Sequence, residues 1–193
     1  MLNVDVSKED DIVRAFAWIK DNLGPVHILV NNAGIACGKR LLDGDSEAWR
    51  NIFQVNVLGL CIATREAIKD MKAHNINGHI IHINSILGHQ VFNFPGISVY
   101  PGSKFAVTAL AEVLRLELNS EKSKIKITSI SPGLVETDII PPQMKETENY
   151  KNMIKEKIIL PPEDIADGVI YALSTPPHVQ IQELTIRPVT EFY

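Results

Sequence analysis

The sequence has few of the features that would place it in several common classes of protein. It contains only two cysteines, Cys37 and Cys61, among 193 residues. Their separation fits no metal-ligand spacing, and two thiols in a chain of this length favour a reducing compartment. No apolar run approaches the roughly 20 residues that span a membrane. We therefore expect a cytoplasmic protein that has no bound metal and is not held in a membrane.

The chain also has no excess of positive charge and no leader-like N-terminus. Its 19 Lys and Arg residues are outnumbered by 23 Asp and Glu residues, which gives a net charge of −4. A basic surface for nucleic acid is therefore not expected. Residues 1–11 alternate apolar and acidic side chains, unlike a signal or transit peptide. With 45% hydrophobic residues, the 193 residues fit a single domain with a full core.

Short apolar segments alternate with amphipathic segments along the chain. We expect strands over five segments, residues 2–6, 26–30, 80–85, 125–131 and 181–186. Helices are expected between them, from an N-cap at Ser7 to Leu23, over 46–74 and 99–119, and from 161–164 onward. Strands separated by helices predict an α/β fold with a parallel sheet covered on both faces.

Residues 134–160 differ from this pattern because they have no clear period and are rich in Pro, Lys, Glu and Met. They follow the end of a predicted strand. In open α/β sheets, ligands bind at the carboxyl ends of the strands. A long connection in that position is typical of a substrate lid, and a surface insertion without a role is the alternative.

Tyr100 and Lys104 lie four residues apart, so a helix places them on one face. A phenol with a pKa of about 10 is a poor acid–base group at neutral pH. A nearby ammonium group lowers that pKa and makes the phenol useful for a carbonyl–alcohol pair. Alone, the pair is also compatible with an ordinary exposed helix surface.

Three further segments favour a catalytic interpretation. Ser85 ends a predicted strand and can donate a hydrogen bond to a substrate oxygen, although a serine is common in a turn after a strand. Residues 31–34, Asn-Asn-Ala-Gly, end another strand with small side chains that let a cofactor approach the backbone. Asn56 is polar within an apolar helical stretch, where bonding to its own helix is the alternative.

Taken together, these motifs resemble the short-chain dehydrogenase/reductase family from Leu2 to the end of the chain. Five family motifs occur in the family's order: Asp5-Val6; Asn32-Ala33-Gly34; Asn56 between two valines; Ser85 with Tyr100 and Lys104; and Pro132-Gly133 followed by Thr137. The resemblance implies a Rossmann-like, doubly wound parallel sheet and a nicotinamide-dependent oxidoreductase.

The resemblance also implies a role for each catalytic position. Tyr100 is the general acid–base, and Lys104 lowers its pKa and binds the nicotinamide ribose. Ser85 orients the substrate oxygen, and Asn56 holds a water molecule in a proton relay. All four residue types stand at the positions that the family motifs require.

For the cofactor, the resemblance implies contacts along the carboxyl edge of the sheet. Asp5 and Val6 would contact the adenine. Residues 32–34, Asn-Ala-Gly, would contact the part of the cofactor backbone next to the adenine. Pro132, Gly133 and Thr137 would contact its nicotinamide half. Residues 171–178 and 186–188 resemble the branch of farnesol dehydrogenase-like and 3-/17-ketosteroid reductase-like proteins. That branch typically uses NADP, and NAD is the alternative.

The chain departs from the family pattern in two ways. Tyr100 comes 15 residues after Ser85, two more than is usual, which we attribute to a longer loop over residues 92–97. The family's glycine-rich phosphate-binding turn does not precede Leu2, so we expect about 60 residues, the first two β–α units, to be missing. Residues 2–6 would then lose their strand partner, and residues 26–30 would form an open apolar edge.

Two functional hypotheses follow. The first is an oxidoreductase acting on an apolar carbonyl or alcohol, such as an isoprenoid or steroid. The second is an inactive member that acts only through an oligomer surface and binds dinucleotide weakly for want of the turn. The apolar substrate class is suggested by side chains on segments near the site, namely Leu87, Phe92, Phe94, Ile139, Ile140 and Met144. In the family, the two long helices form a subunit contact, so a homodimer or homotetramer is expected.

Overall fold

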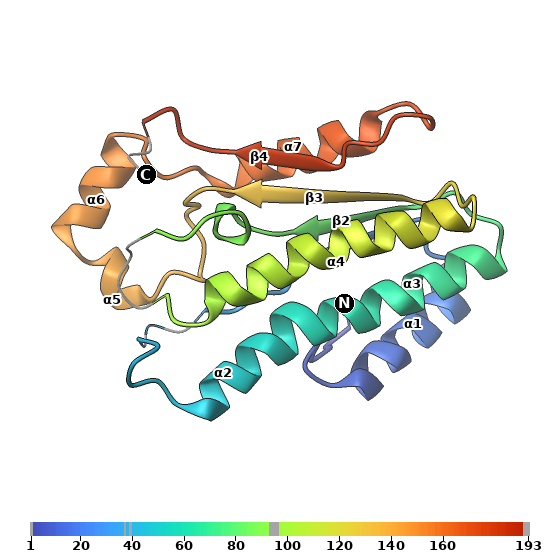
Figure 1. The fold of residues 1–193 in the computed structure, drawn as a ribbon, viewed down its shortest axis with the longest axis horizontal. Coiled ribbons are helices and arrows are strands. Elements are labelled where there is room, and N and C mark those ends of the chain that lie inside the picture. The colour runs from blue at the N-terminus through green and yellow to red at the C-terminus, as the bar shows by residue number, and fades with distance from the viewer. Residues whose placement is uncertain (1, 37, 39, 93–96, 191–193) are drawn as a thin grey trace.

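The computed structural model describes residues 2–36, 38, 40–92 and 97–190, and Figure 1 shows their arrangement. Cys37 and Phe94 lie outside the described residues, as does most of the expected loop over 92–97. Four strands are found, β1 (Ile28–Asn31), β2 (His79–Ile83), β3 (Lys126–Pro132) and β4 (Glu183–Ile186). The principal α-helices are α1 (Glu9–Leu23), α2 (Ser46–Phe53), α3 (Leu60–Ala73), α4 (Tyr100–Ser120) and α7 (Pro162–Ser174).

The four strands form one parallel sheet, as the sequence predicts, and their order in it is β1-β2-β3-β4. Ile80 of β2 pairs with Leu29 of β1 and with Ile127 of β3, so apolar side chains lie in register across the centre. Because every strand runs in the same direction, all four carboxyl ends meet at one edge of the sheet (Figure 1). This edge is where the predicted functional residues should gather.

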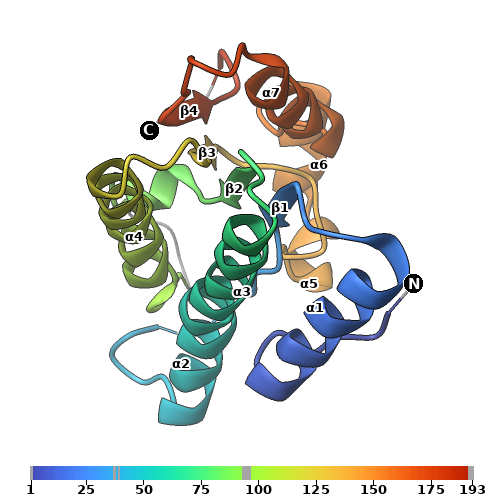
Figure 2. The ribbon, with the colours of Figure 1, turned by 90° about the vertical axis from the view of Figure 1, so that its right-hand side faces the viewer.

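Helices cover the two faces of the sheet, and two apolar clusters show which helix packs on which face. Ile80 and Ile127 pack with Ala67 of α3 and Ala111 of α4. The neighbouring Ile81 belongs to a second cluster on the opposite face, with residues of α7. Figure 2 looks along the strands and shows α3 and α4 on one side of the sheet and α7 on the other. The fold is therefore a Rossmann-like α/β fold.

The position of α7 gives the crossover from β3 to β4 an unusual handedness. The chain advances across the sheet in one direction from β1 to β4, yet α3 and α4 cover one face and α7 the other (Figures 1 and 2). The β1–β2 and β2–β3 crossovers are right-handed, as about 98% of such connections are. The β3–β4 crossover through α7 is left-handed.

The predicted helix over 46–74 is confirmed as one continuous rod of three parts. α2 begins with a cap in which the Asp45 carboxylate accepts a hydrogen bond from Ala48 N at 2.8 Å. The backbone then widens into a π-helical turn, η1 (Gln54–Gly59), before α3 continues to Ala73. Single π-turns inside α-helices occur frequently at functional sites. No periodic pattern in the sequence indicates this π-turn.

Two predictions for the N-terminal residues are wrong. Residues 2–6 form no strand, because no described strand lies beside them to complete a hydrogen-bonded ladder. Ser7 does not cap α1, whose N-cap is Lys8 without a side-chain hydrogen bond. Instead, both the N–H and the hydroxyl of Ser7 donate to the Asp5 carboxylate, at 3.0 and 2.7 Å.

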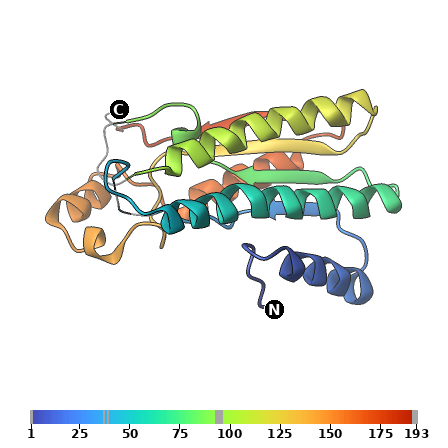
Figure 3. The same cartoon turned by 60° about the horizontal axis from the view of Figure 1, so that its bottom comes forward.

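Residues 134–160 contain two short helices, α5 (Pro142–Lys145) and α6 (Glu148–Lys155). Their base is closed by a bridge in which Glu136 N donates to Leu160 O at 2.9 Å and Leu160 N donates to Leu134 O at 2.9 Å. Ile140, Tyr150 and Ile159 form a small apolar core within the segment. Figure 3 shows α5 and α6 projecting beyond the carboxyl ends of the strands.

At the other side of the sheet, β1 is the terminal strand among the described residues. The side chains of Ile28 and Val30 are 51% and 41% exposed. Within the described part of the chain, no helix is both long and apolar enough to cross a membrane.

Candidate active site

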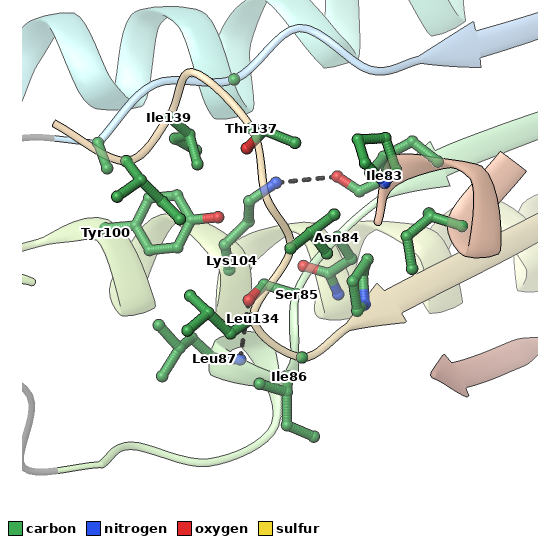
Figure 4. A pocket seen from close by; sticks show the side chains of 18 of the residues that line it. Ile83, Asn84, Ser85, Ile86, Leu87, Tyr100, Lys104, Leu134, Thr137 and Ile139 are labelled. Atoms are coloured by element: carbon green, nitrogen blue, oxygen red, sulfur yellow. Dashed lines mark hydrogen bonds between the residues drawn. The ribbon is translucent and has the colours of Figure 1, made fainter. Parts of the chain in front are cut away.

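A cavity of about 730 Å³ opens at the carboxyl ends of the strands, between the sheet and the segment 134–160. Figure 4 shows side chains from β2, α4 and the segment after β3 around it. Eight of the residues predicted to form the site line this cavity: Asn32, Gly34, Ser85, Tyr100, Lys104, Pro132, Gly133 and Thr137. These residues span more than 100 positions of the sequence, and the parallel sheet brings them together.

Tyr100 is the first residue of α4, where Pro101 is tolerated because the first helical N–H groups have no partner within the helix. Its hydroxyl points toward Lys104 and Thr137 in the cavity (Figure 4). Burial raises the pKa of Tyr100 to about 12, and a hydrogen bond with Ser85 acts in the opposite direction. The phenol therefore carries its proton at neutral pH.

Lys104 is one helical turn further along α4, and its side chain is only 5% exposed. Its Nζ donates to Ile83 O at the end of β2, at 2.9 Å, and lies 5.7 Å from the centre of the Tyr100 ring (Figure 4). Burial lowers the pKa of Lys104 to about 8. We expected Lys104 to lower the pKa of Tyr100, but burial of the phenol raises it and the lowering influence comes from Ser85.

Ser85 follows β2 and is the N-cap of a short 3₁₀ helix, η2 (Ile86–Gly88). Its Oγ accepts a hydrogen bond from Leu87 N at 3.1 Å, which fixes the side chain at the cavity wall (Figure 4). Ser85 also acts to lower the pKa of Tyr100. Both residues line the cavity at the end of the sheet, so both can contact one ligand oxygen there.

Asn56 lies in the π-turn η1 and is 2% exposed. Its Oδ1 accepts from Ile35 N at 2.9 Å, and its Nδ2 donates to Ile35 O at 2.9 Å and to Ser103 Oγ at 3.0 Å. The Ser103 hydroxyl in turn donates to Tyr100 O at 2.7 Å. Asn56 thus connects the loop after β1 to the backbone of Tyr100. The alternative, in which its side chain bonds to its own helix, is wrong.

The predicted cofactor residues are only partly brought together. Gly34 lies beside the site, since a Cβ added there would be 3.6 Å from Asn56 Oδ1 and 3.9 Å from Lys104 Nζ. Ala33, Asp5 and Val6 do not line the cavity. Asp5 is instead exposed, and its carboxylate accepts hydrogen bonds from Ser7 and pairs with Lys8 at 3.3 Å.

Much of the remaining cavity wall is apolar. Five of the six apolar residues named from the sequence are described, and all five line it: Leu87, Phe92, Ile139, Ile140 and Met144. Side chains of α7 that the sequence analysis did not single out also contribute, among them Ile165 and Val169. The cavity is therefore bounded by β2, the loop after it, the segment 134–160 and α7.

Two polar residues of the site were missed by the sequence analysis. Asn84, 4% exposed, lines the cavity next to Ser85 and donates to Thr108 Oγ1 at 2.8 Å. Ser103, 0% exposed, bridges Asn56 and Tyr100 as described above. The sequence shows a serine between Tyr100 and Lys104, but it reveals neither the burial of that serine nor its partner, Asn56, which lies 47 residues away.

No cluster of three or more metal-ligating side chains occurs among the residues that the structure describes. His79 and His82 contact different partners, Thr128 Oγ1 at 2.8 Å and Thr64 Oγ1 at 3.3 Å. Burial lowers the pKa of each to about 4, so both imidazoles are neutral at pH 7.

A Rossmann-like sheet with serine, tyrosine and lysine at its carboxyl edge is the architecture of a nucleotide-dependent oxidoreductase. Comparison with known sequences agrees, because the short chain dehydrogenase family matches residues 1–148. The chain belongs to the short-chain dehydrogenase/reductase family.

Relatives of known name cover nearly all of the chain. It is 46% identical over 188 residues to farnesol dehydrogenase from Aedes aegypti, spanning 97% of this chain and 74% of that protein. It is 44% identical over 186 residues to dehydrogenase/reductase SDR family member 11 from Homo sapiens, spanning 95% of this chain and 72% of that protein.

Solved structures share the fold. The closed form of serine dehydrogenase complexed with NADP+ aligns with a TM-score of 0.86 at 29% identity, over 100% of this chain and 77% of that one. An alcohol dehydrogenase from the archaeon Thermococcus sibiricus, complexed with 5-hydroxy-NADP, aligns with a TM-score of 0.81 at 25% identity, over 98% and 74% of the two chains.

Proposed function

We propose that the protein interconverts a carbonyl and an alcohol on an apolar substrate, with NADP(H) as the hydride carrier and Tyr100 as general acid–base. The observation that carries this proposal is the meeting of three side chains in one cavity. Ser85, Tyr100 and Lys104 all line it, Ser85 acts to lower the pKa of Tyr100, and Lys104 Nζ lies 5.7 Å from the centre of the Tyr100 ring. These residues come from two elements, the turn after β2 and the start of α4, which pack directly against each other.

Tyr100 and Ser85 would act together on the substrate oxygen. The pKa of Tyr100, raised to about 12, keeps the phenol protonated at neutral pH, so it can donate a proton to a carbonyl that is being reduced. The Ser85 hydroxyl, held by Leu87 N, would donate a hydrogen bond to the same oxygen and stabilise its developing charge. In the direction of oxidation, Tyr100 would take the proton back.

Lys104 and Asn56 would support this proton transfer. The ammonium of Lys104 favours the phenolate that remains after Tyr100 has donated its proton. Asn56 anchors the backbone of Tyr100 through Ser103 and, in the role that the family implies, holds a water molecule that returns a proton to the site. All four groups are buried or partly buried, where charge is stabilised more strongly than in water.

The residues present fit the nicotinamide half of NADP(H), which supplies the hydride when bound. Lys104 Nζ faces the cavity next to Gly34, where the small residue leaves room for a ribose. Pro132, Gly133 and Thr137 also line the cavity. Two structural neighbours are complexes with NADP+ and 5-hydroxy-NADP, which supports NADP over NAD as the proposed cofactor.

The substrate would be an apolar carbonyl or alcohol of the isoprenoid or steroid class. The walls formed by Leu87, Phe92, Ile139 and Met144 are apolar, and the cavity volume suits a small-molecule ligand. The similarity to farnesol dehydrogenase supports the isoprenoid alternative in particular. The segment 134–160 would act as the lid over this space.

Two measurements test the proposal. NADPH fluorescence is titrated with the 193-residue chain, and with the same chain fused behind the first two β–α units of a family member. The fusion is then assayed for NADPH oxidation with farnesal and with a steroid ketone. We expect turnover with at least one substrate. A fusion that binds NADPH but turns over neither substrate would contradict the proposed function.

A further inference from the structure

The helix that carries Tyr100 begins from a strained turn. Tyr100 N donates to Ile97 O at 3.0 Å, so Ser98 and Val99 are the central residues of a four-residue turn. Ser98 has a φ of 47°, in the left-handed region that side chains other than glycine, asparagine and aspartate rarely adopt. Such a residue keeps this conformation only where its surroundings hold it.

The group that holds Ser98 comes from α2. Trp49 Nε1 donates to Ser98 Oγ at 3.0 Å, across 49 residues of sequence. The indole is seated against Gly44, because a Cβ at that position would lie 2.7 Å from Trp49 Nε1 and 2.8 Å from Arg40 O. Position 44 therefore has to be a glycine for the indole to reach Ser98.

The continuation of α2 into η1 makes a second connection to Tyr100. Asn56, seven residues after Trp49, donates to Ser103 Oγ, which donates to Tyr100 O. Trp49 is therefore hydrogen-bonded to the turn before Tyr100, and Asn56 is connected through Ser103 to the carbonyl of Tyr100 itself. α2 and η1 both pack against α4, so these are two anchors of one helix-to-helix contact.

We propose that Trp49 is a positioning residue for Tyr100: its indole N–H holds Ser98 in the left-handed turn and so sets where the phenol enters the cavity. This inference rests on the proposed role of Tyr100. Trp49 does not line the cavity, and its effect passes through Ser98.

The test compares Trp49→Phe, which removes the N–H but keeps a ring, with Ser98→Ala, which removes the acceptor. In the fusion protein, each should lower kcat about tenfold while the KM for NADPH stays within about twofold, because misplacement of a reacting group affects the chemical step. The double variant should be no worse than either single variant. Ser98→Asn should restore most of kcat, since asparagine tolerates a positive φ and supplies an acceptor.

The matched control is Trp18→Phe, since Trp18 lies on α1 with 42% exposure and does not line the cavity. Its kcat should equal that of the parent. Parent-like kcat in Trp49→Phe, additive losses in the double variant, or the same loss in Ser98→Asn as in Ser98→Ala would each overturn the proposal. Thermal unfolding of every variant shows whether a loss comes from unfolding instead.

A second readout separates this inference from the proposed function. Fluorine NMR is recorded on the 193-residue chain labelled with fluorotyrosine, and the Tyr100 resonance is assigned by its loss in Tyr100→Phe. It should move in Trp49→Phe and Ser98→Ala, while the resonance of the exposed Tyr171 stays in place. If the fusion binds NADPH but has no turnover, the proposed function fails and this readout alone decides on Trp49. An unmoved Tyr100 resonance would then refute the positioning role.

Discussion

Tyr100 has surroundings that favour a proton donor, which leads to the first prediction. Tyr100→Phe removes only the hydroxyl, so NADPH affinity in the fusion protein should change little. The value of kcat should fall by a factor of about 10² to 10⁴, because a positioned proton donor contributes that much. Steady-state kinetics and an NADPH titration measure the two effects. More than a tenth of the parent turnover would remove Tyr100 from the mechanism.

His82 gives a prediction about acid stability. It is 1% exposed, and burial lowers its folded-state pKa from 6.5 to about 4. Between these values the unfolded chain binds a proton that the folded chain does not. The free energy of unfolding should therefore decrease as the pH falls from about 6.5 to 4, by at most about 3 kcal/mol from this residue.

Urea unfolding at several pH values measures this dependence. His82→Asn should give a shallower decrease than the parent, whatever its absolute stability. His79, whose pKa is also lowered to about 4, contributes in the same direction and remains in the variant. Val189→Ala, at a fully exposed position without a titratable group, is the control and should keep the parent slope. An unchanged slope in His82→Asn would contradict the assignment.

Single residues of the site were predictable to different degrees. Ser85, Tyr100 and Lys104 were found because their spacing carries chemistry, and all three line one cavity. Trp49 and Ser103 were not singled out, because each acts through a side chain or backbone group that only the tertiary fold brings near. The raised pKa of Tyr100 also depends on burial, which residue spacing does not reveal.

Among the secondary-structure elements, η1 makes a close contact that yields a third prediction. A Cβ at Gly59 would lie 2.5 Å from Val6 O, a backbone atom that cannot move without displacing the N-terminal segment. Gly59→Ala should therefore lower the free energy of unfolding by about 1–3 kcal/mol, despite the higher helix propensity of alanine.

Gly102→Ala is the matched control, because it also lies in a helix but a Cβ there would meet only Phe53 Cζ, at 3.8 Å. This change should leave stability equal or raise it by up to about 1 kcal/mol. Urea unfolding compares the two variants with the parent. Equal effects of the two substitutions would show that Val6 does not pack against η1 as described.

The sequence predicted most elements because their apolar periodicity is local. The helices over 46–74 and 99–119 appear as α2-η1-α3 and α4, each within one or two residues of its predicted ends. The strand over 2–6 failed because a strand depends on a neighbour that its own residues do not specify. The π-turn at Asn56 and the two short helices in 134–160 also lacked a periodic signal.

For the molecule as a whole, we predict self-association through α4 and the α2–η1 rod. Their outer surfaces carry exposed apolar side chains, namely Phe53 at 40%, Leu58 at 47%, Phe105 at 42%, Val113 at 48% and Leu116 at 53%. Burial of this surface against a second copy would stabilise a dimer or tetramer with closed symmetry. Sedimentation at micromolar concentration should show that species.

Charge placed on this surface should disrupt the assembly. The double variant Val113→Glu/Leu116→Glu should sediment as a monomer with unchanged thermal unfolding of the secondary structure. Leu42→Glu is the control, since Leu42 is 88% exposed in a loop outside both helices. A parent chain that sediments as a monodisperse monomer would contradict the prediction.

The left-handed connection through α7 places the last helix on the face of the sheet opposite α3 and α4, and this has a consequence for ligand binding. Ile165 and Val169 of α7 line the cavity, so the binding space is complete only while α7 is docked on the sheet. A ligand that fills this space binds only the docked form. Ligand binding and the docking of α7 are therefore thermodynamically linked.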